Sequence, residues 1–172
     1  MSEIIDFYTN KPTKSKYTLD EVLSKGDDWL ENCHSHIQWL FPIHTQSHFN
    51  EDSPILTKEI AEEFVKNAEA VANFDKAILR MLSFLGIDWD SENGVLSLSD
   101  NYDFQKYTWT EFNHNSLRIT RMLTCMSILG RQDFAVKLYS FMFSELLGKK
   151  HNMAKSLNYW ADALNGLNKR LE

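Results

Sequence analysis

The sequence contains few residues that break helices or cross-link chains. Of its 172 residues, 6 are glycine, 3 are proline and 2 are cysteine. So little glycine and proline argues against a turn-rich β fold and against a disordered chain. Cys33 and Cys125 alone are too few for a disulfide framework, so we expect a reducing compartment, the cytoplasm.

The sequence also lacks basic runs and long apolar runs. The formal net charge is -6, whereas proteins that bind nucleic acid nonspecifically need many Lys and Arg to neutralise phosphates. No apolar segment approaches the length of a membrane span, and residues 1–7 contain no charged segment followed by an apolar run. We therefore expect neither nucleic-acid binding nor membrane association.

The common sequence motifs of enzymes are absent too. There is no Gly-rich phosphate loop, no Gly-x-Ser-x-Gly, no His-Glu-x-x-His and no paired Cys-x-x-Cys. We expect no cofactor and no catalytic residues, which makes an enzyme the less favoured class. An enzyme would have to use a buried His114 as a general base, with Arg118 and Arg121 holding an anion.

What the sequence does contain is a series of helical patterns rich in aromatic residues, with 11 Phe, 6 Tyr and 5 Trp. Apolar residues at helical spacing predict helices over residues 18–25, 28–40, 57–65, 71–85, 113–129, 134–147 and 152–171. The predicted fold is an all-α, single-domain bundle of about six or seven helices. A small hairpin is expected near residues 88–98.

Residues 1–16 are predicted to form a flexible or loosely packed N-terminal arm, and residues 17–172 a single helical domain. The arm is polar and contains Pro12, but Ile4, Ile5 and Phe7 could lie against the core.

The segment 113–129 is predicted to be the central helix, begun by Asn113 or Asn115 and ended by Gly130. On a helical wheel it divides into three arcs. The small polar arc, predicted to face solvent, contains Ser116, Thr120, Thr124 and Ser127. The apolar arc contains Ile119, Met122, Leu123, Met126 and Leu129. A narrow line within the apolar half contains His114, Arg118, Arg121 and Cys125.

Arg118 and Arg121 therefore carry charge into an apolar environment, where a guanidinium needs carboxylates, carbonyls or a bound anion as partners. Two interpretations stay open. The first is an internal polar network that holds helices together, and the second is a pocket for an anion or carboxylate. Gln38 is a plausible partner from the helix predicted over 28–40. The candidate ligand site or structural network is His34, Gln38, His114, Arg118 and Arg121.

A metal site is not predicted. His34 and His36, and His44 and His48, have spacings that metal ligands use, but residues 42–53 read as a loop and no carboxylate or thiolate has an obvious place beside them. Residues 88–94 have a superficial likeness to a calcium loop. Gly94 falls one place late and Ser99 replaces the required Glu, so a turn is expected.

Two sequence blocks resemble a known family. Residues 114–123, HNSLRITRML, and residues 34–42, HSHIQWLFP, are similar to the two hallmark blocks of the opioid growth factor receptor conserved region. In animal members this resemblance implies growth-regulatory peptide binding.

The sequence ends at Glu172 without the long C-terminal tail and basic nuclear-targeting segments of those animal members. We therefore expect a short standalone homologue of microbial or viral type and do not transfer opioid-peptide binding. The predicted function is a non-catalytic protein- or peptide-interaction domain with a regulatory role. The alternative is a small anionic-ligand-binding protein, conceivably an enzyme, that uses a buried Arg/His pocket.

Overall fold

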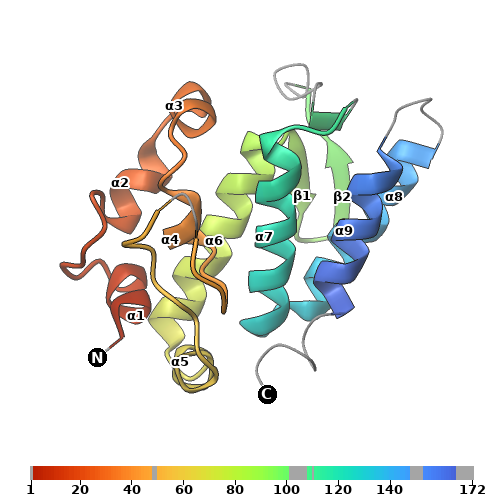
Figure 1. Cartoon of the computed structure of the whole chain (residues 1–172). Helices are drawn as coiled ribbons and strands as arrows, with labels where there is room; N and C mark the ends of the chain where they lie inside the picture. The colour runs from red at the N-terminus through yellow and green to blue at the C-terminus, as the bar shows by residue number, and fades with distance from the viewer. Residues whose placement is uncertain (1, 48–49, 101–107, 110, 148–152, 166–172) are drawn as a thin grey trace. The chain divides into compact units, whose positions relative to one another are not determined.

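A computed structural model describes residues 2–47, 50–100, 108–109, 111–147 and 153–165. These residues form nine helices and one two-stranded antiparallel sheet, which confirms the all-α class with a small hairpin. Contacts divide the described chain into two compact units, residues 2–78 and 79–165, and the division falls inside helix α6, Ala68–Phe84 (Figure 1). Within the described ranges, every helix is too short or too polar to cross a membrane.

The first unit is built from short helices that precede α6. They are α1 (Glu3–Tyr8), α2 (Leu19–Ser24), α3 (Asp27–Asn32), α4 (Ile37–Leu40) and α5 (Lys58–Phe64). The long connection between α4 and α5 is closed by a parallel bridge between Ile43 and Ile55. There the backbone N–H of Leu56 donates to the Ile43 carbonyl oxygen at 3.0 Å.

Tyr8 lies in the core of the first unit, among aromatic rings. Its ring centroid is 5.1 Å from that of Phe64 and 5.7 Å from that of Phe74, both in edge-to-face geometry. The Tyr8 hydroxyl donates to the Leu40 carbonyl oxygen, and the Tyr8 carbonyl oxygen accepts from Asn73 Nδ2 at 2.8 Å. Because these polar groups are bonded, the side chain can be completely buried without an unpaired hydroxyl.

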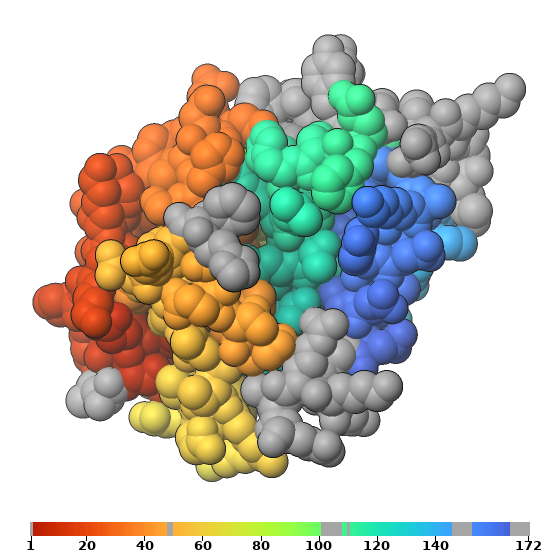
Figure 2. Space-filling model, viewed as in Figure 1, coloured from red at the N-terminus to blue at the C-terminus, as the bar shows by residue number. Residues whose placement is uncertain are grey.

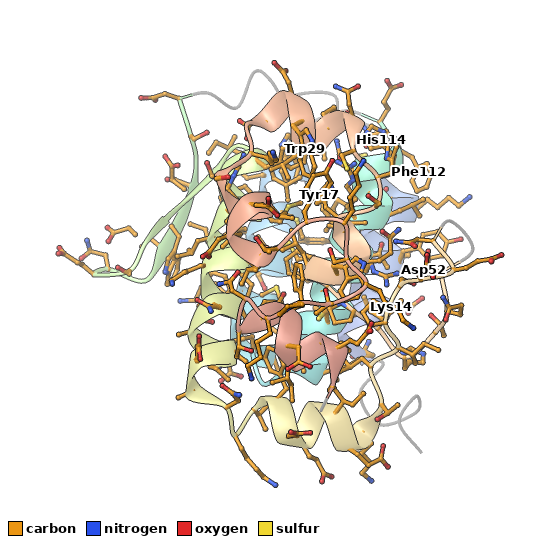
Figure 3. All side chains as sticks on the ribbon, turned by 90° about the vertical axis from the view of Figure 1, so that its left-hand side faces the viewer. Lys14, Tyr17, Trp29, Asp52, Phe112 and His114 are labelled. Carbon is orange, nitrogen blue, oxygen red and sulfur yellow. The ribbon has the colours of Figure 1, made fainter. Side chains whose placement is uncertain are left out.

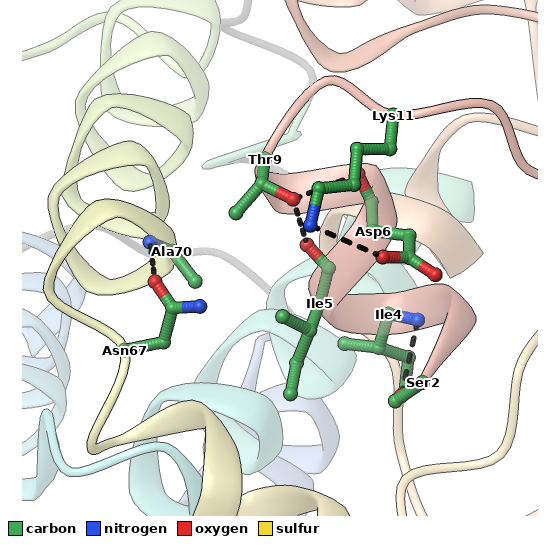
Figure 4. A network of polar contacts seen from close by, with 8 residues as sticks. All are labelled: Ser2, Ile4, Ile5, Asp6, Thr9, Lys11, Asn67 and Ala70. Carbon is green, nitrogen blue, oxygen red and sulfur yellow. Dashed lines mark hydrogen bonds and ion pairs between the residues drawn. The ribbon is translucent and has the colours of Figure 1, made fainter.

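Helix α1 is stabilised by polar side chains at its ends (Figure 4). Ser2 Oγ accepts from the Ile4 N–H at 3.3 Å, and Lys11 Nζ lies 3.7 Å from Asp6 Oδ1. The residues that the sequence placed against the core are all buried, namely Ile4, Ile5 and Phe7. Figure 4 also shows the cap of α6, where Asn67 Oδ1 accepts from the Ala70 N–H at 3.0 Å.

The start of α2 forms the predicted capping box. Thr18 Oγ1 accepts from the Glu21 N–H at 3.2 Å, and Glu21 Oε2 accepts from the Thr18 N–H at 2.7 Å. The two side chains satisfy backbone donors that the helix itself leaves free.

The single helix predicted over residues 28–40 is wrong, because α3 ends at Asn32 and α4 begins only at Ile37. Cys33 is extended, with a φ of -91° and a ψ of 117°. Asn32 Nδ2 donates to the Asp28 carbonyl oxygen at 2.8 Å. Short polar side chains offer the backbone such alternative hydrogen bonds, which is why helices end readily at these residues. This break and the formation of α1 account for the two helices beyond the predicted seven.

Tyr17 and Trp29 hold the segment that precedes α2 against α3, and Figure 3 shows the two side chains together. Their ring centroids are 5.2 Å apart in edge-to-face geometry. Lys25 Nζ lies 5.5 Å from the Tyr17 centroid and 5.6 Å from the Trp29 centroid. The His36 ring contacts Trp29 at 5.4 Å.

The second unit begins with the end of α6 and continues through a hairpin and three helices. The hairpin pairs β1 (Ile87–Asp90) with β2 (Val95–Leu98), and the helices are α7 (His114–Ile128), α8 (Gln132–Leu147) and α9 (Ala154–Asn165). The last residues of the helix predicted over 152–171, from 166 onward, lie outside the described residues.

The hairpin turn is closed by Asp90 and Gly94. Asp90 Oδ1 accepts from the N–H groups of Glu92 at 2.9 Å and Asn93 at 3.1 Å, while Gly94 has a φ of 66°. A positive φ at this position favours glycine, so the turn residues fit the predicted hairpin.

The hairpin also packs on α8. Lys137 Nζ donates to the Gly94 carbonyl oxygen at 2.9 Å and lies 5.3 Å from the Trp89 ring centroid. Trp89 and Phe134 meet edge to face at 4.8 Å.

Helices α7 and α9 lie side by side and run in the same direction, and α8, which comes between them in the sequence, runs in the opposite direction (Figure 1). Trp160 of α9 is completely buried, and its Nε1 donates to the Ser116 carbonyl oxygen at 3.0 Å. Gln132 Nε2 of α8 donates to the Leu164 carbonyl oxygen at 3.3 Å. The three helices are thus joined by hydrogen bonds as well as by apolar packing.

Candidate functional site

Helix α7 carries three of the predicted site residues and has the boundaries that the sequence predicts. Asn113 Oδ1 accepts from the Asn115 N–H at 2.9 Å, and Ser116 Oγ accepts from the Asn113 N–H at 3.3 Å. At the other end Gly130 has a φ of 78°, in the left-handed region where helices commonly end. The helix is therefore fixed by side-chain caps at its start and by glycine at its end.

Arg118 is almost completely buried and forms part of a polar network within the second unit. Its Nη1 donates to Asn115 Oδ1 at 3.0 Å, and Asn115 Nδ2 donates to Thr108 Oγ1 at 3.3 Å. Its guanidinium carbon lies 5.7 Å from the Phe84 ring centroid. The Asn115 amide oxygen and the Phe84 ring thus lie beside a charge whose burial would otherwise be costly.

Trp109, the residue after Thr108, connects this part of the chain to the end of α6. Trp109 is buried, and its Nε1 donates to the Leu85 carbonyl oxygen at 3.2 Å. The sequence treated Asn115 only as a possible cap and did not assign it to Arg118. Its spacing of three residues from Arg118 places both on one helix face, and this spacing was the available signal.

Arg121 lies one turn further and is mostly removed from solvent. Burial lowers the pKa of Arg121 to about 10, with the neighbouring Cys125 thiol opposing that shift. Burial also raises the pKa of the Cys125 thiol. At neutral pH the arginine therefore stays charged and the thiol stays protonated, so Cys125 acts here as a small apolar core residue.

His114 is exposed at the start of α7 (Figure 3). The predicted line on this helix therefore runs from solvent at His114 to the interior at Cys125. The enzyme alternative required a buried His114, whereas this side chain is exposed in the first turn of α7.

His34 and Gln38 belong to the first unit, and their contact with the arginines of α7 stays a prediction. His34 is exposed, whereas Gln38 is buried. The Gln38 amide nitrogen donates to the carbonyl oxygens of His34 at 2.9 Å and Ser35 at 3.0 Å. Gln38 therefore stabilises the link between α3 and α4.

The small polar arc of α7 does not face solvent as predicted. Ser116, Thr124 and Ser127 are buried. Thr124 Oγ1 donates to the Thr120 carbonyl oxygen at 2.9 Å, and Thr120 Oγ1 donates to that of Ser116 at 3.0 Å. Hydroxyls that bond their own helix can be buried, and small side chains let another helix approach closely. The recurrence of serine and threonine at helical spacing was the signal that could have predicted this buried side of α7.

The histidines form no metal-ligand set in the described part of the chain, where no cluster of three or more His, Cys, Asp or Glu residues is arranged to hold an ion. His36 is buried and packs on Trp29, while His48 lies outside the described residues. Hydrogen bonds connect Arg118, Asn115 and Thr108.

Comparison with known proteins identifies the family. The family model described as the opioid growth factor receptor (OGFr) conserved region matches residues 3–172. The chain belongs to this family. No solved structure shows a significant match.

The opioid growth factor receptor-like protein 1 of Xenopus tropicalis is 39% identical over 144 residues, which cover 81% of this chain and 28% of the relative. The mouse protein of that name is 38% identical over 146 residues, covering 82% and 31%. The opioid growth factor receptor of the mouse is 30% identical over 149 residues, covering 83% and 23%.

The chain thus spans between about a quarter and a third of the length of these relatives. The expectation of a microbial or viral homologue receives no support from these relatives, which come from vertebrates.

Proposed function

We propose that this chain is a non-catalytic module that binds a protein or peptide and has a regulatory role. The observation that carries the proposal is the bond between Arg118 and Asn115, because it gives this buried signature arginine a partner within its own helix. The matched relatives are much longer proteins, which supports the idea of a module. Their names describe an opioid growth factor receptor, but we do not extend that ligand to this chain.

The compartment that we propose is the cytoplasm. Cys33 and Cys125 are both free thiols, which fits a reducing environment.

A selection from a library of short random peptides displayed on phage tests the interaction proposal. We expect the immobilised, folded chain to enrich peptides with one shared pattern, and those peptides to saturate binding at one per chain in solution calorimetry. A matched selection on the Trp160→Ala variant controls for binding to exposed core, because this change removes a buried anchor. Enrichment of unrelated peptides, or of the same peptides on both proteins, would contradict the proposal.

The alternative is an anion site that uses Arg118 and Arg121. It is supported by the strong desolvation that lowers the pKa of Arg121 to about 10, because a buried cation attracts anions strongly. Thermal melting of the wild type and Arg121→Met with phosphate, nucleotides and carboxylates tests it, since a ligand of the native state raises the melting midpoint. A rise in the wild type alone supports the anion site, and unchanged midpoints in both proteins eliminate it for these ligands.

A further inference from the structure

The second unit exposes three large apolar side chains, one just before α7, one in the first turn of α7 and one in the middle of α9. Phe112 is 47% exposed, Leu117 54% and Tyr159 49%. Together with Lys155 they are called the α7–α9 patch below. Scattered exposed apolar residues are ordinary, but a continuous group is typical of a binding surface.

The patch residues lie on or next to α7 and α9, and these two helices are in contact. Leu117 follows Ser116 and Tyr159 precedes Trp160, and these two neighbours are hydrogen-bonded to each other. Lys155 Nζ lies 5.9 Å from the Phe112 centroid and 6.0 Å from the Tyr159 centroid. The exposed side chains therefore flank the line along which the two helices meet, and Figure 2 shows α7 and α9 next to each other on one face.

The patch contains one ammonium group, that of Lys155, although the chain as a whole has a net charge of -6. The first turns of α7 and α9 contain no acidic residue, and the same is true of α4. The first turns of α1, α2, α3, α5, α6 and α8 each contain at least one. Two parallel helix starts and one ammonium give a positive potential that favours carboxylates. Glu111, just before Phe112, is the nearest acidic residue in the sequence.

The size and charge of the patch argue against a second copy of this chain as its occupant. Three half-exposed large side chains offer roughly 300 Å² of apolar area, whereas a stable interface needs about 800 Å² from each partner. Two copies would also bring together chains that each carry a net charge of -6. A short segment of a different protein fits this area better.

We propose that the α7–α9 patch binds an amphipathic helix of a partner protein, with Asp or Glu at the end that meets Lys155. An amphipathic helix carries its apolar residues on one face, at i, i+3, i+4 and i+7, so that they can reach Phe112, Leu117 and Tyr159 in turn. This inference rests on the proposed interaction function and names its surface and the chemistry of its partner.

Two synthetic amphipathic helical peptides of about 15 residues are the probes. Both carry the same leucine face, and one carries glutamates along its polar flank where the other carries lysines. Fluorescence anisotropy of the labelled peptides with the full chain should give tighter binding of the glutamate peptide, with a difference that falls as salt is added. Glu111→Gln should strengthen binding of the glutamate peptide slightly.

Substitutions locate the site. Leu117→Ser with Tyr159→Ser should weaken binding of the glutamate peptide about tenfold or more, because few side chains carry most of the energy of an interface. Lys155→Glu should reverse the preference between the two peptides. Val136→Ser is the matched control, because Val136 of α8 is 43% exposed and lies outside the patch, and this change should leave binding unaltered.

The outcomes separate this inference from the proposed function. The inference is wrong if neither peptide binds the wild type, or if both bind the patch variants as they bind the wild type. In that case, phage-selected peptides that still bind the chain would preserve the interaction function and place it on another surface. If the phage selection also fails, both the proposed interaction function and the α7–α9 patch are wrong.

Discussion

The two units bury polar groups in different ways. In the first unit, Tyr8 lies among aromatic rings, and its hydroxyl is a single polar group with a backbone acceptor. In the second, Arg118 and Asn115 are buried together and bonded to each other. The region around Tyr8 therefore depends mainly on the volume and shape of its side chains, and the region around Arg118 depends on particular donors and acceptors.

This difference predicts different responses to substitution. A core of packed rings tolerates loss of a hydrogen bond better than loss of volume, because the cavity adds to the lost burial. A polar network responds strongly to loss of one partner, because the remaining group stays buried and unsatisfied.

The largest effect is expected at Tyr8. Tyr8→Ala should lower the free energy of unfolding by about 3–5 kcal/mol, because it leaves a cavity in the aromatic core. Tyr8→Phe keeps the ring and should cost only about 1 kcal/mol for the lost hydrogen bond. Urea unfolding followed by circular dichroism measures both, and equal losses would show that the hydroxyl matters more than packing.

Asn115→Ala should have the next largest effect, about 2–3 kcal/mol, because Arg118 Nη1 loses an acceptor and Thr108 Oγ1 loses a donor. The same urea measurement detects it. Asn115→Leu combined with Arg118→Met should be less destabilised than the sum of the two single changes, since it removes both partners. Strict additivity would mean that the bond contributes nothing.

Substitutions of Thr124 test how closely the small polar arc of α7 is packed. Thr124→Leu should cost about 1–3 kcal/mol, because a larger side chain is forced into a packed position. Thr124→Val removes a hydroxyl bonded within its own helix and should cost less than about 1 kcal/mol. Thermal melting distinguishes the two variants. Equal stability of Thr124→Leu and the wild type would imply that this side of α7 is not closely packed.

The smallest effect concerns the hairpin turn and depends on pH. Hydrogen bonds from the Asn93 side chain and backbone, with that from the Glu92 backbone, lower the pKa of Asp90 below its ordinary value. A lowered carboxyl pKa stabilises the fold above the pKa of the unfolded chain, and this stabilisation is lost as pH falls through the folded pKa.

Amide resonances of Asn93 and Gly94 followed by NMR across acid pH should therefore show a transition below the pKa of free aspartate. Asp90→Asn should remove the transition. A midpoint at or above the free value would contradict the hydrogen-bonded turn.

Local signals in the sequence predicted the local structure well. Thr18 with Glu21 predicted a capping box, Asn113 and Gly130 predicted the ends of α7, and residues 88–98 predicted a hairpin. These features depend on backbone groups within a few residues, so the sequence contains all that is needed to recognise them.

Predictions that required knowledge of neighbouring elements were less successful. The helical wheel grouped the residues of α7 into arcs but assigned the small polar arc to solvent, because composition cannot show which element packs against it. The break between α3 and α4 at Cys33 was not predicted, because the apolar pattern continues across it. The break is stabilised by Asn32 and Gln38, whose side chains bond the backbone on either side.

For this protein, the sequence by itself determined the helical class, the family and the need of Arg118 for a partner. Only the tertiary structure decided that Asn115 is a partner, that Ser116 and Thr124 are buried, and that Phe112 and Tyr159 flank one lysine. The physical reason is that caps and periodicity act over one or two helical turns, whereas burial depends on which distant segment of the chain packs against a given face.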